Sequence, residues 1–164
     1  MTARPGPAGR GGPTGPAGAD PGSLSHLGGV LRTAAATLAT DLVGLNPGTP
    51  TAQLCATTVD RLDTVGVALQ THAQDLSIAA AAVARLADQV HAAGLTLSGW
   101  SVEEPYGLVS AERAEGRRAA RPDLQAQADR LAASLARSRA QLDRLLGRAD
   151  SDLDEAVRAV RAPD

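Results

Sequence analysis

Apolar residues recur at strict seven-residue intervals through the middle of this chain. Such spacing places side chains along one stripe of an α-helix, and a long stripe is typical of helices that pack side by side. The main stripe consists of Cys55, Leu62, Leu69, Leu76, Val83 and Val90. A companion set lies four positions further on, at Val59, Ala73, Ala80 and Ala87. The pattern predicts one long helix that contacts more than one neighbour.

Interruptions in the periodicity divide the chain into helices. The first helix is expected over about residues 26–44, with Ser25 as its N-cap. The second is expected over about residues 50–93, because Thr49 can cap it and Pro50 suits a first helical position. Gly94 then marks its end.

A third helix is expected near the C-terminus. Residues 94–121 contain several glycines and Trp100, and are expected to form a loop in which Ser110, Ala111 and Glu112 could open a short helix. The helix then covers about residues 122–161, beginning at Pro122. Its apolar face includes Leu131, Leu135 and Leu142.

These elements predict an all-α protein. Residues 24–162 would form an antiparallel bundle of three or four helices, two of them about 40 residues long. Residues 1–23 are rich in proline and glycine and are expected to be a disordered tail. Helices of this length leave ends that a compact monomer would not cover, so we expect a homodimer or a heterodimer with another helical protein.

Composition excludes several function classes. The net charge of −2 offers no electrostatic basis for binding nucleic acid. All 16 basic residues are arginine, which removes P-loop and Schiff-base lysine chemistry and is typical of a GC-rich bacterial genome. No signal peptide or transmembrane stretch is evident. The expected location is the cytoplasm, or the exterior by a non-classical route.

Catalytic, cofactor and metal sites are not predicted. Glu103 and Glu104 are adjacent beside a proline, where we expect solvated charges. His72 and Asp75 share a helix face, but two ligands do not make a metal site. The protein is therefore expected to act without enzymatic chemistry and without a cofactor.

Trp100 and Tyr106 are the only aromatic residues. A lone tryptophan near the tip of a helical hairpin can anchor a protein interface. Equally, it can plug the open end of a core that has few large side chains. Both residues are candidate interaction residues, and the anchor and plug hypotheses stay open.

The helical pattern resembles the WXG100 (ESX-like) proteins of type VII secretion. A Leu/Ala helix, a tight break and a long heptad helix follow one another from Leu27 to Val90. The family's Trp-x-Gly belongs in the hairpin turn, whereas the only tryptophan here lies in the next connection, which allows a second alignment there. The family's export signal, a Tyr followed four residues later by an acid, is absent, because Ser110 follows Tyr106 at that distance.

The resemblance implies a small helical partner, a secreted substrate or a chaperone of type VII secretion. The alternative is a cytosolic structural or scaffold coiled-coil protein. A third hypothesis is an amphipathic protein that coats a storage granule or membrane surface.

The heptad stripe can be tested by substitution. Leu76→Asp places an unpaired charge on the stripe and should unfold or dissociate the helices. Leu69→Ala should cost about 2–5 kcal/mol if that side chain is fully buried. Circular dichroism melts measure both effects, and melts identical to the parent would show that the stripe is not a packing surface.

Overall fold

The computed structural model describes residues 20–44, 46–107 and 109–161. These residues form three helices and one small sheet, and they confirm the expected mostly helical fold. The elements in chain order are α1 (Pro21–Asp41), α2 (Pro50–Ala92), β1 (Thr96–Ser98), β2 (Ser101–Glu103) and α3 (Ala111–Arg161). Residues 1–19 of the predicted tail lie outside the described residues, and the prediction is wrong for residues 20–23, which cap and begin α1.

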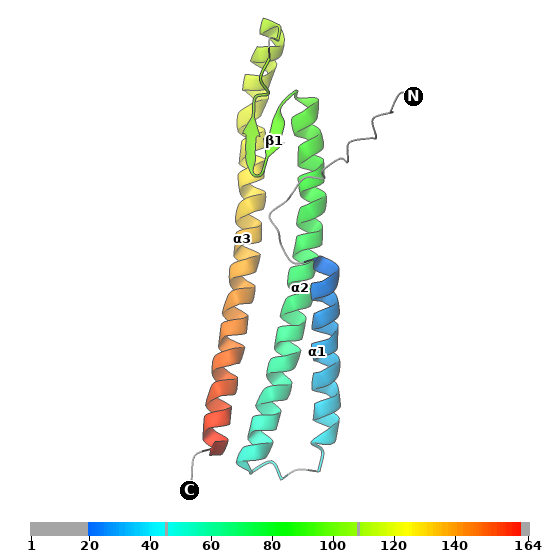
Figure 1. Cartoon of the computed structure of the whole chain (residues 1–164), viewed down its shortest axis with the longest axis vertical. Coiled ribbons are helices and arrows are strands. Elements are labelled where there is room, and N and C mark those ends of the chain that lie inside the picture. The colour runs from blue at the N-terminus through cyan, green and yellow to red at the C-terminus, as the bar shows by residue number, and fades with distance from the viewer. Residues whose placement is uncertain (1–19, 45, 108, 162–164) are drawn as a thin grey trace, which may run out of the picture.

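The helices are arranged around α2. α1 packs against α2, and α2 packs against α3. Figure 1 shows α1 and α3 on opposite sides of α2, so the described helices form an open layer. Neighbouring helices run antiparallel, and α1, with 21 residues, lies beside only the lower half of the 43-residue α2.

The first helix begins earlier than the sequence analysis expects. Asp20 is the N-cap and Pro21 is in the first turn, so Ser25 lies inside α1 and not before it. The Asp20 carboxylate accepts a hydrogen bond of 2.8 Å from the Ser23 backbone N–H. That bond, joined by one from the Ser23 hydroxyl, holds the pKa of Asp20 below its usual value. An acidic cap before proline is the stronger start signal, because it satisfies a free N–H and complements the helix dipole.

α2 starts and stops where the sequence analysis places it. Thr49 Oγ1 accepts a hydrogen bond of 3.2 Å from Ala52 N–H, and Pro50 opens the helix. At the other end Gly94 has φ +72°, a left-handed conformation that glycine adopts without strain. The Leu95 N–H then bonds Val90 O at 2.9 Å, which closes the helix in a Schellman-type turn.

α1 and α2 approach through a pair of glycines. A Cβ atom built on Gly28 would lie 2.6 Å from Gly66 O, and one on Gly66 would lie 2.7 Å from Gly28 O. Either methyl group would force the backbones apart. Gly28, which weakens a helix in isolation, therefore stands where the two helices need direct backbone contact.

The expected loop over residues 94–121 is wrong in its extent. A β-hairpin occupies part of it, and α3 begins at Ala111, eleven residues before the predicted start at Pro122. The helix passes through Pro122 although proline removes one intrahelical hydrogen bond. Contacts with the hairpin hold this extra segment, since Arg121 Nε donates to Val102 O at 3.0 Å.

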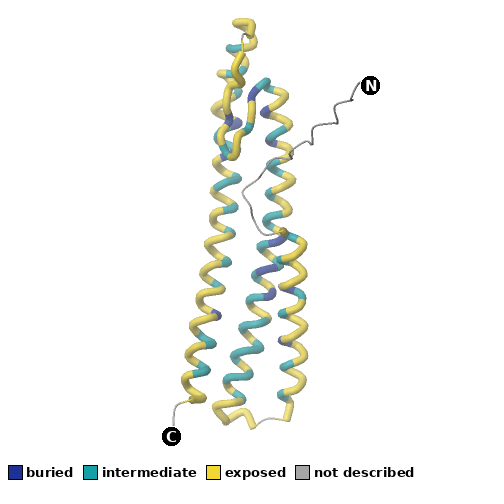
Figure 2. The backbone as a smooth tube through the Cα atoms, viewed as in Figure 1, coloured by how far each residue is buried: buried dark blue, intermediate teal, exposed yellow. Residues whose placement is uncertain are grey.

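The main apolar cluster lies at the hairpin end of the molecule, where the hairpin packs between α2 and α3 (Figure 2). Its buried members are Leu86, Val90, Leu95, Val102, Leu124 and Ala128. Along the predicted stripe, Leu69 and Val90 are buried, and the other members are half-buried: Cys55, Leu62, Leu76 and Val83. The α3 positions Leu131, Leu135 and Leu142 are also half-buried.

The glycine contact predicts that alanine substitutions at two helical glycines change the free energy of unfolding in opposite directions. Gly66→Ala should destabilise the protein by about 1–3 kcal/mol, because overpacking against the Gly28 carbonyl exceeds the gain in helix propensity. Gly147 is also helical, but a Cβ there would meet no atom within 4 Å. Gly147→Ala should therefore stabilise the protein by up to about 1 kcal/mol. Urea unfolding of both variants measures the direction of each stability change. Equal effects would contradict the close approach of Gly66 to Gly28.

Candidate functional site

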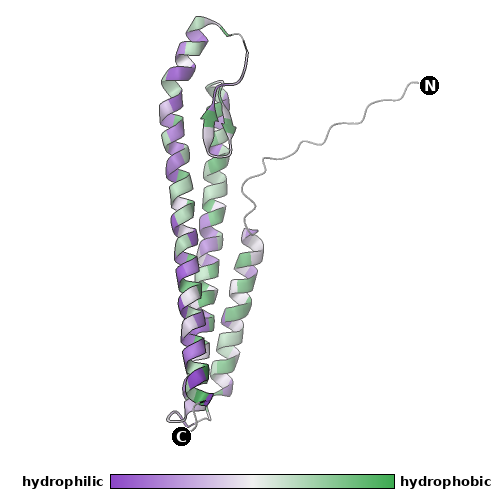
Figure 3. Cartoon of the chain, turned by 60° about the vertical axis from the view of Figure 1, so that its left-hand side comes forward, coloured by the Kyte–Doolittle hydropathy of each residue, from purple (hydrophilic) through white to green (hydrophobic). Residues whose placement is uncertain are grey.

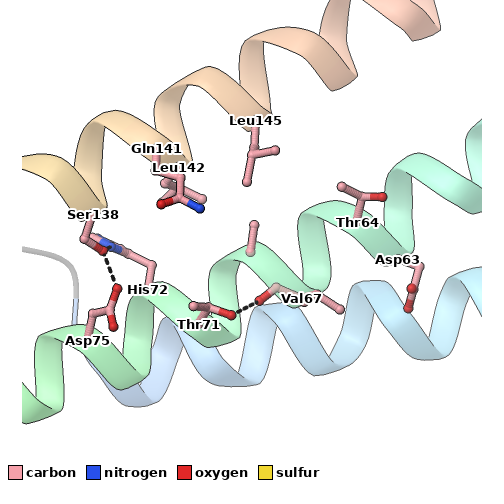
Figure 4. Close-up of a pocket in the computed structure, with 11 residues that line it drawn as sticks. Asp63, Thr64, Val67, Thr71, His72, Asp75, Ser138, Gln141, Leu142 and Leu145 are labelled. Carbon is pink, nitrogen blue, oxygen red and sulfur yellow. Dashed lines mark hydrogen bonds between the residues drawn. The ribbon is translucent and has the colours of Figure 1, made fainter.

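A groove of about 410 Å³ lies between α2 and α3, below the hairpin. Val67 of α2 and Leu142 and Leu145 of α3 line its apolar part (Figure 4). Val67 is 44% exposed, so this wall is open to an incoming molecule. The groove therefore offers apolar surface where two helices are incompletely sealed.

Three polar side chains close one end of this groove. Ser138 of α3 lies between His72 and Asp75 of α2, as Figure 4 shows. The Ser138 hydroxyl donates to Asp75 Oδ2 at 2.7 Å, and His72 Nδ1 lies 2.8 Å from Ser138 Oγ. Because a hydroxyl has one proton, the contact with His72 requires Nδ1–H to donate to Ser138. We assign the Nδ1-protonated form from this network.

The order of these hydrogen bonds decides what the cluster can do. In Ser-His-acid catalysis, the histidine accepts the serine proton and the acid orients the histidine. Here the carboxylate of Asp75 accepts the hydrogen bond from the Ser138 hydroxyl, so His72 is not the acceptor of that bond. The cluster connects α2 to α3 as a polar clamp.

The sequence analysis weighed His72 and Asp75 only as metal ligands. The structure adds a serine hydroxyl to them rather than a third ligand of the usual kind. Within residues 20–44, 46–107 and 109–161, no group of three or more His, Cys, Asp or Glu side chains could hold a metal ion.

Ion pairs join the helices on both sides of α2. Arg32 of α1 bonds Asp63 at 3.1 Å and Gln70 at 3.3 Å. On the α3 side, Arg61 Nε lies 3.0 Å from Asp152 Oδ2, without the angle of a hydrogen bond. The side chains of both pairs are more than a third exposed, so each pair contributes at most about 1 kcal/mol, although Arg61 Nε itself is buried.

The β-hairpin holds Trp100 in its turn. Gly99 has φ +59° and occupies the first central position, which is typical of a type II′ turn. The register pairs Leu97 with Val102, a pair whose backbone groups point away from the hairpin. Side chains of α3 satisfy the outward-facing backbone groups of Val102. Gln125 Oε1 accepts a hydrogen bond from Val102 N–H at 2.8 Å, and Arg121 Nε donates one to Val102 O. Gln125 Nε2 also donates to Trp100 O at 3.0 Å.

The structure separates the two aromatic candidates. Trp100 is half-buried and packs against the apolar cluster at the hairpin end. Tyr106 is fully exposed after β2, next to Gly107. Neither residue lines the α2–α3 groove. The position of Trp100 is compatible with the plug hypothesis, and Tyr106 is free to meet a partner.

The sequence analysis did not predict two features, the β-hairpin and the contact of Ser138 with α2. Alternation around Gly99, with Leu97 and Val102 turned inward, was a short signal for a hairpin. Ser138 carries no such signal, because its partners are 63 and 66 positions away.

The chain was compared with known proteins. No family model, curated protein or solved structure matches it.

The polar clamp predicts a modest and specific effect of removing Ser138. Ser138→Ala leaves Asp75 without its interhelical donor and should lower the free energy of unfolding by about 0.5–1.5 kcal/mol. Ser134 is exposed on the same helix, so Ser134→Ala serves as the matched control. A fluorophosphonate probe should not label Ser138, and rapid labelling would contradict the assigned hydrogen bonds.

Proposed function

We propose that this chain is a non-enzymatic interaction protein that associates with a helical partner. The open layer carries this proposal. α2 has α1 beside only half of its length, and its contact with α3 leaves a groove with an apolar wall. Long helices with incompletely covered faces are suited to accept further helices.

The small core supports the same proposal. Ten apolar residues are buried among those that the structure describes, and four of them are alanines: Ala35, Ala73, Ala128 and Ala149. A core of this size contributes little stability to a chain of this length. A partner that binds only the folded form would stabilise it by mass action.

We further propose that the partner belongs to a type VII-like secretion process, in which the chain acts as partner, substrate or chaperone. Trp100 lies in the connection between α2 and α3, two antiparallel helices of 43 and 51 residues. This placement favours the alignment of the WXG100 pattern with the α2–α3 hairpin over its alignment with α1 and α2. The residue two after Trp100 is Val102 and not glycine, so the match is to position only.

A cytosolic scaffold protein is the second candidate. The observation that favours it is the length of α3, whose first turns extend beyond the end of α2 (Figure 1). Figure 3 shows hydrophilic and hydrophobic residues interspersed along this helix, which is typical of an amphipathic helix. Among the described residues, no helix is both long and apolar enough to cross a bilayer.

A pull-down from the native host tests the proposal. The tagged full-length chain is recovered separately from lysate and from culture filtrate, and co-purifying proteins are identified. We expect one defined helical protein, and its presence in the filtrate would support the secretion process. Recovery from lysate with no other protein would contradict a heterologous partner.

Two variants make this experiment specific to the groove. Val67→Arg places a charge on the apolar wall of the groove and should reduce recovery of the partner at least tenfold. Leu146 is 39% exposed but does not line the groove, so Leu146→Arg should retain the partner. Equal recovery with both variants would show that the partner binds elsewhere.

A further inference from the structure

One side of α2 is covered by α1 over only part of its length. Val59, Gly66 and Ala73 follow one another at seven-residue spacing, and Gly66 contacts α1 directly. Ala84 lies 18 residues beyond Gly66, which is five turns, so the two residues face the same direction. Ala84 is nevertheless exposed, because α1 does not extend that far. We call this uncovered side the α2 notch: Ser77, Ala80, Ala84 and His91, flanked by the half-buried Ala87 and the exposed Asp88.

α1 has an outer face that nothing covers within the described residues. Leu27 is 47% exposed and Val30 is 49% exposed, and Ala34 and Thr37 are exposed beside them. The single arginine of α1, Arg32, turns toward α2, where it bonds Asp63 and Gln70. The outer face carries no arginine. It is apolar around Val30 and Ala34, and His26, Thr33 and Asp41 add polar groups to it. Exposed leucine and valine on the same helix face are costly to leave in water.

The notch and α1 match in length. α1 has 21 residues, and α2 continues for 19 residues from Ala73 to its end at Ala92. A two-fold axis perpendicular to the layer, placed beside the N-terminal end of α1, would bring each α1 into the notch of the other copy. One rotation then covers both open surfaces at once and closes the assembly, which a C2 dimer requires.

We propose that two copies of this chain form such a dimer, with the outer face of α1 seated in the partner's α2 notch. The inference deepens the proposed function, on which it rests, by naming the first partner as a second copy. The notch continues the side of α2 that already binds α1 through Gly66, and the small side chains of Ala80 and Ala84 permit the approach of another helix. The α2–α3 groove stays free for a different protein.

The size of the contact fits a stable dimer. A helix of about 20 residues is about 30 Å long and about 10 Å wide, which gives a footprint of about 300 Å². The dimer contains two such contacts, and each buries one face of α1 and one notch. The four faces together bury about 1,200 Å², which is at the lower limit of stable interfaces. The Pro/Gly-rich N-terminal segment and an unrelated helix are the other candidates for the notch.

Disulfide trapping in the full-length chain tests the geometry. Gly28 lies opposite Gly66, so Val30 lies near residue 64 of its own α2, about 30 Å along the helix from Ala84. A disulfide between these positions cannot form within one chain. The variant Val30→Cys/Ala84→Cys, with Cys55→Ser, should give a covalent dimer under mild oxidation. The pair Val30→Cys/Arg139→Cys, in the same background, should stay monomeric because α3 lies at the outer edge of the dimer.

Light scattering on the full-length protein provides the second test. The parent should have twice the chain mass, Ala84→Arg should be monomeric with an unchanged circular dichroism spectrum, and Ala136→Arg, on exposed α3, should remain dimeric. A monomeric parent overturns the proposal and is the result expected if the N-terminal segment or another protein fills the notch. A dimeric Ala84→Arg also overturns it. Neither result bears on the pull-down, because that experiment identifies other proteins and uses Val67 in the groove.

Discussion

The backbone contact between Gly28 and Gly66 determines how the layer is built. It brings α1 against the lower half of α2 so closely that neither glycine has room for a Cβ atom. This contact also sets the register in which Arg32 lies over Asp63 and Gln70. Because α1 is held at that level, no other described segment covers the upper half of α2 on the same side. Both the open layer and the α2 notch follow from this position of α1.

α2 and α3 are joined by apolar packing at the hairpin end and by polar contacts further along. At the hairpin end, Leu86, Val90 and Val102 form a dry cluster, and Gln125 satisfies the outward-facing backbone of the hairpin. Further along, the same helices are connected by the Ser138 clamp and by the Arg61–Asp152 pair. Polar contacts near the surface fix register but contribute little net stability. The groove therefore lies in the part of the interface that is least sealed, while the hairpin keeps the two helices together.

Much of the helical architecture could be predicted from local signals. Thr49, Pro50 and Gly94 give the start and the end of α2, because capping and left-handed glycine are properties of a few adjacent residues. The sequence analysis missed the start of α1 because both Asp20 and Ser25 are possible caps. Only Asp20 is followed directly by proline, which suits the first turn of a helix. The start of α3 was missed because Pro122 normally marks a first turn. There the contact of Arg121 with Val102 stabilises helix on both sides of the proline.

The sequence alone determined that the chain is mostly helical, that a long central helix has one apolar stripe, and that lysine chemistry is absent. These properties depend on composition and on spacing along one helix. Only the tertiary structure decided that Ser138 lies between His72 and Asp75, that Gln125 holds the Trp100 turn, and that α1 covers half of α2. Each of these depends on the register between helices, which arises from contacts between residues far apart in the chain and leaves no periodic signal in any one segment.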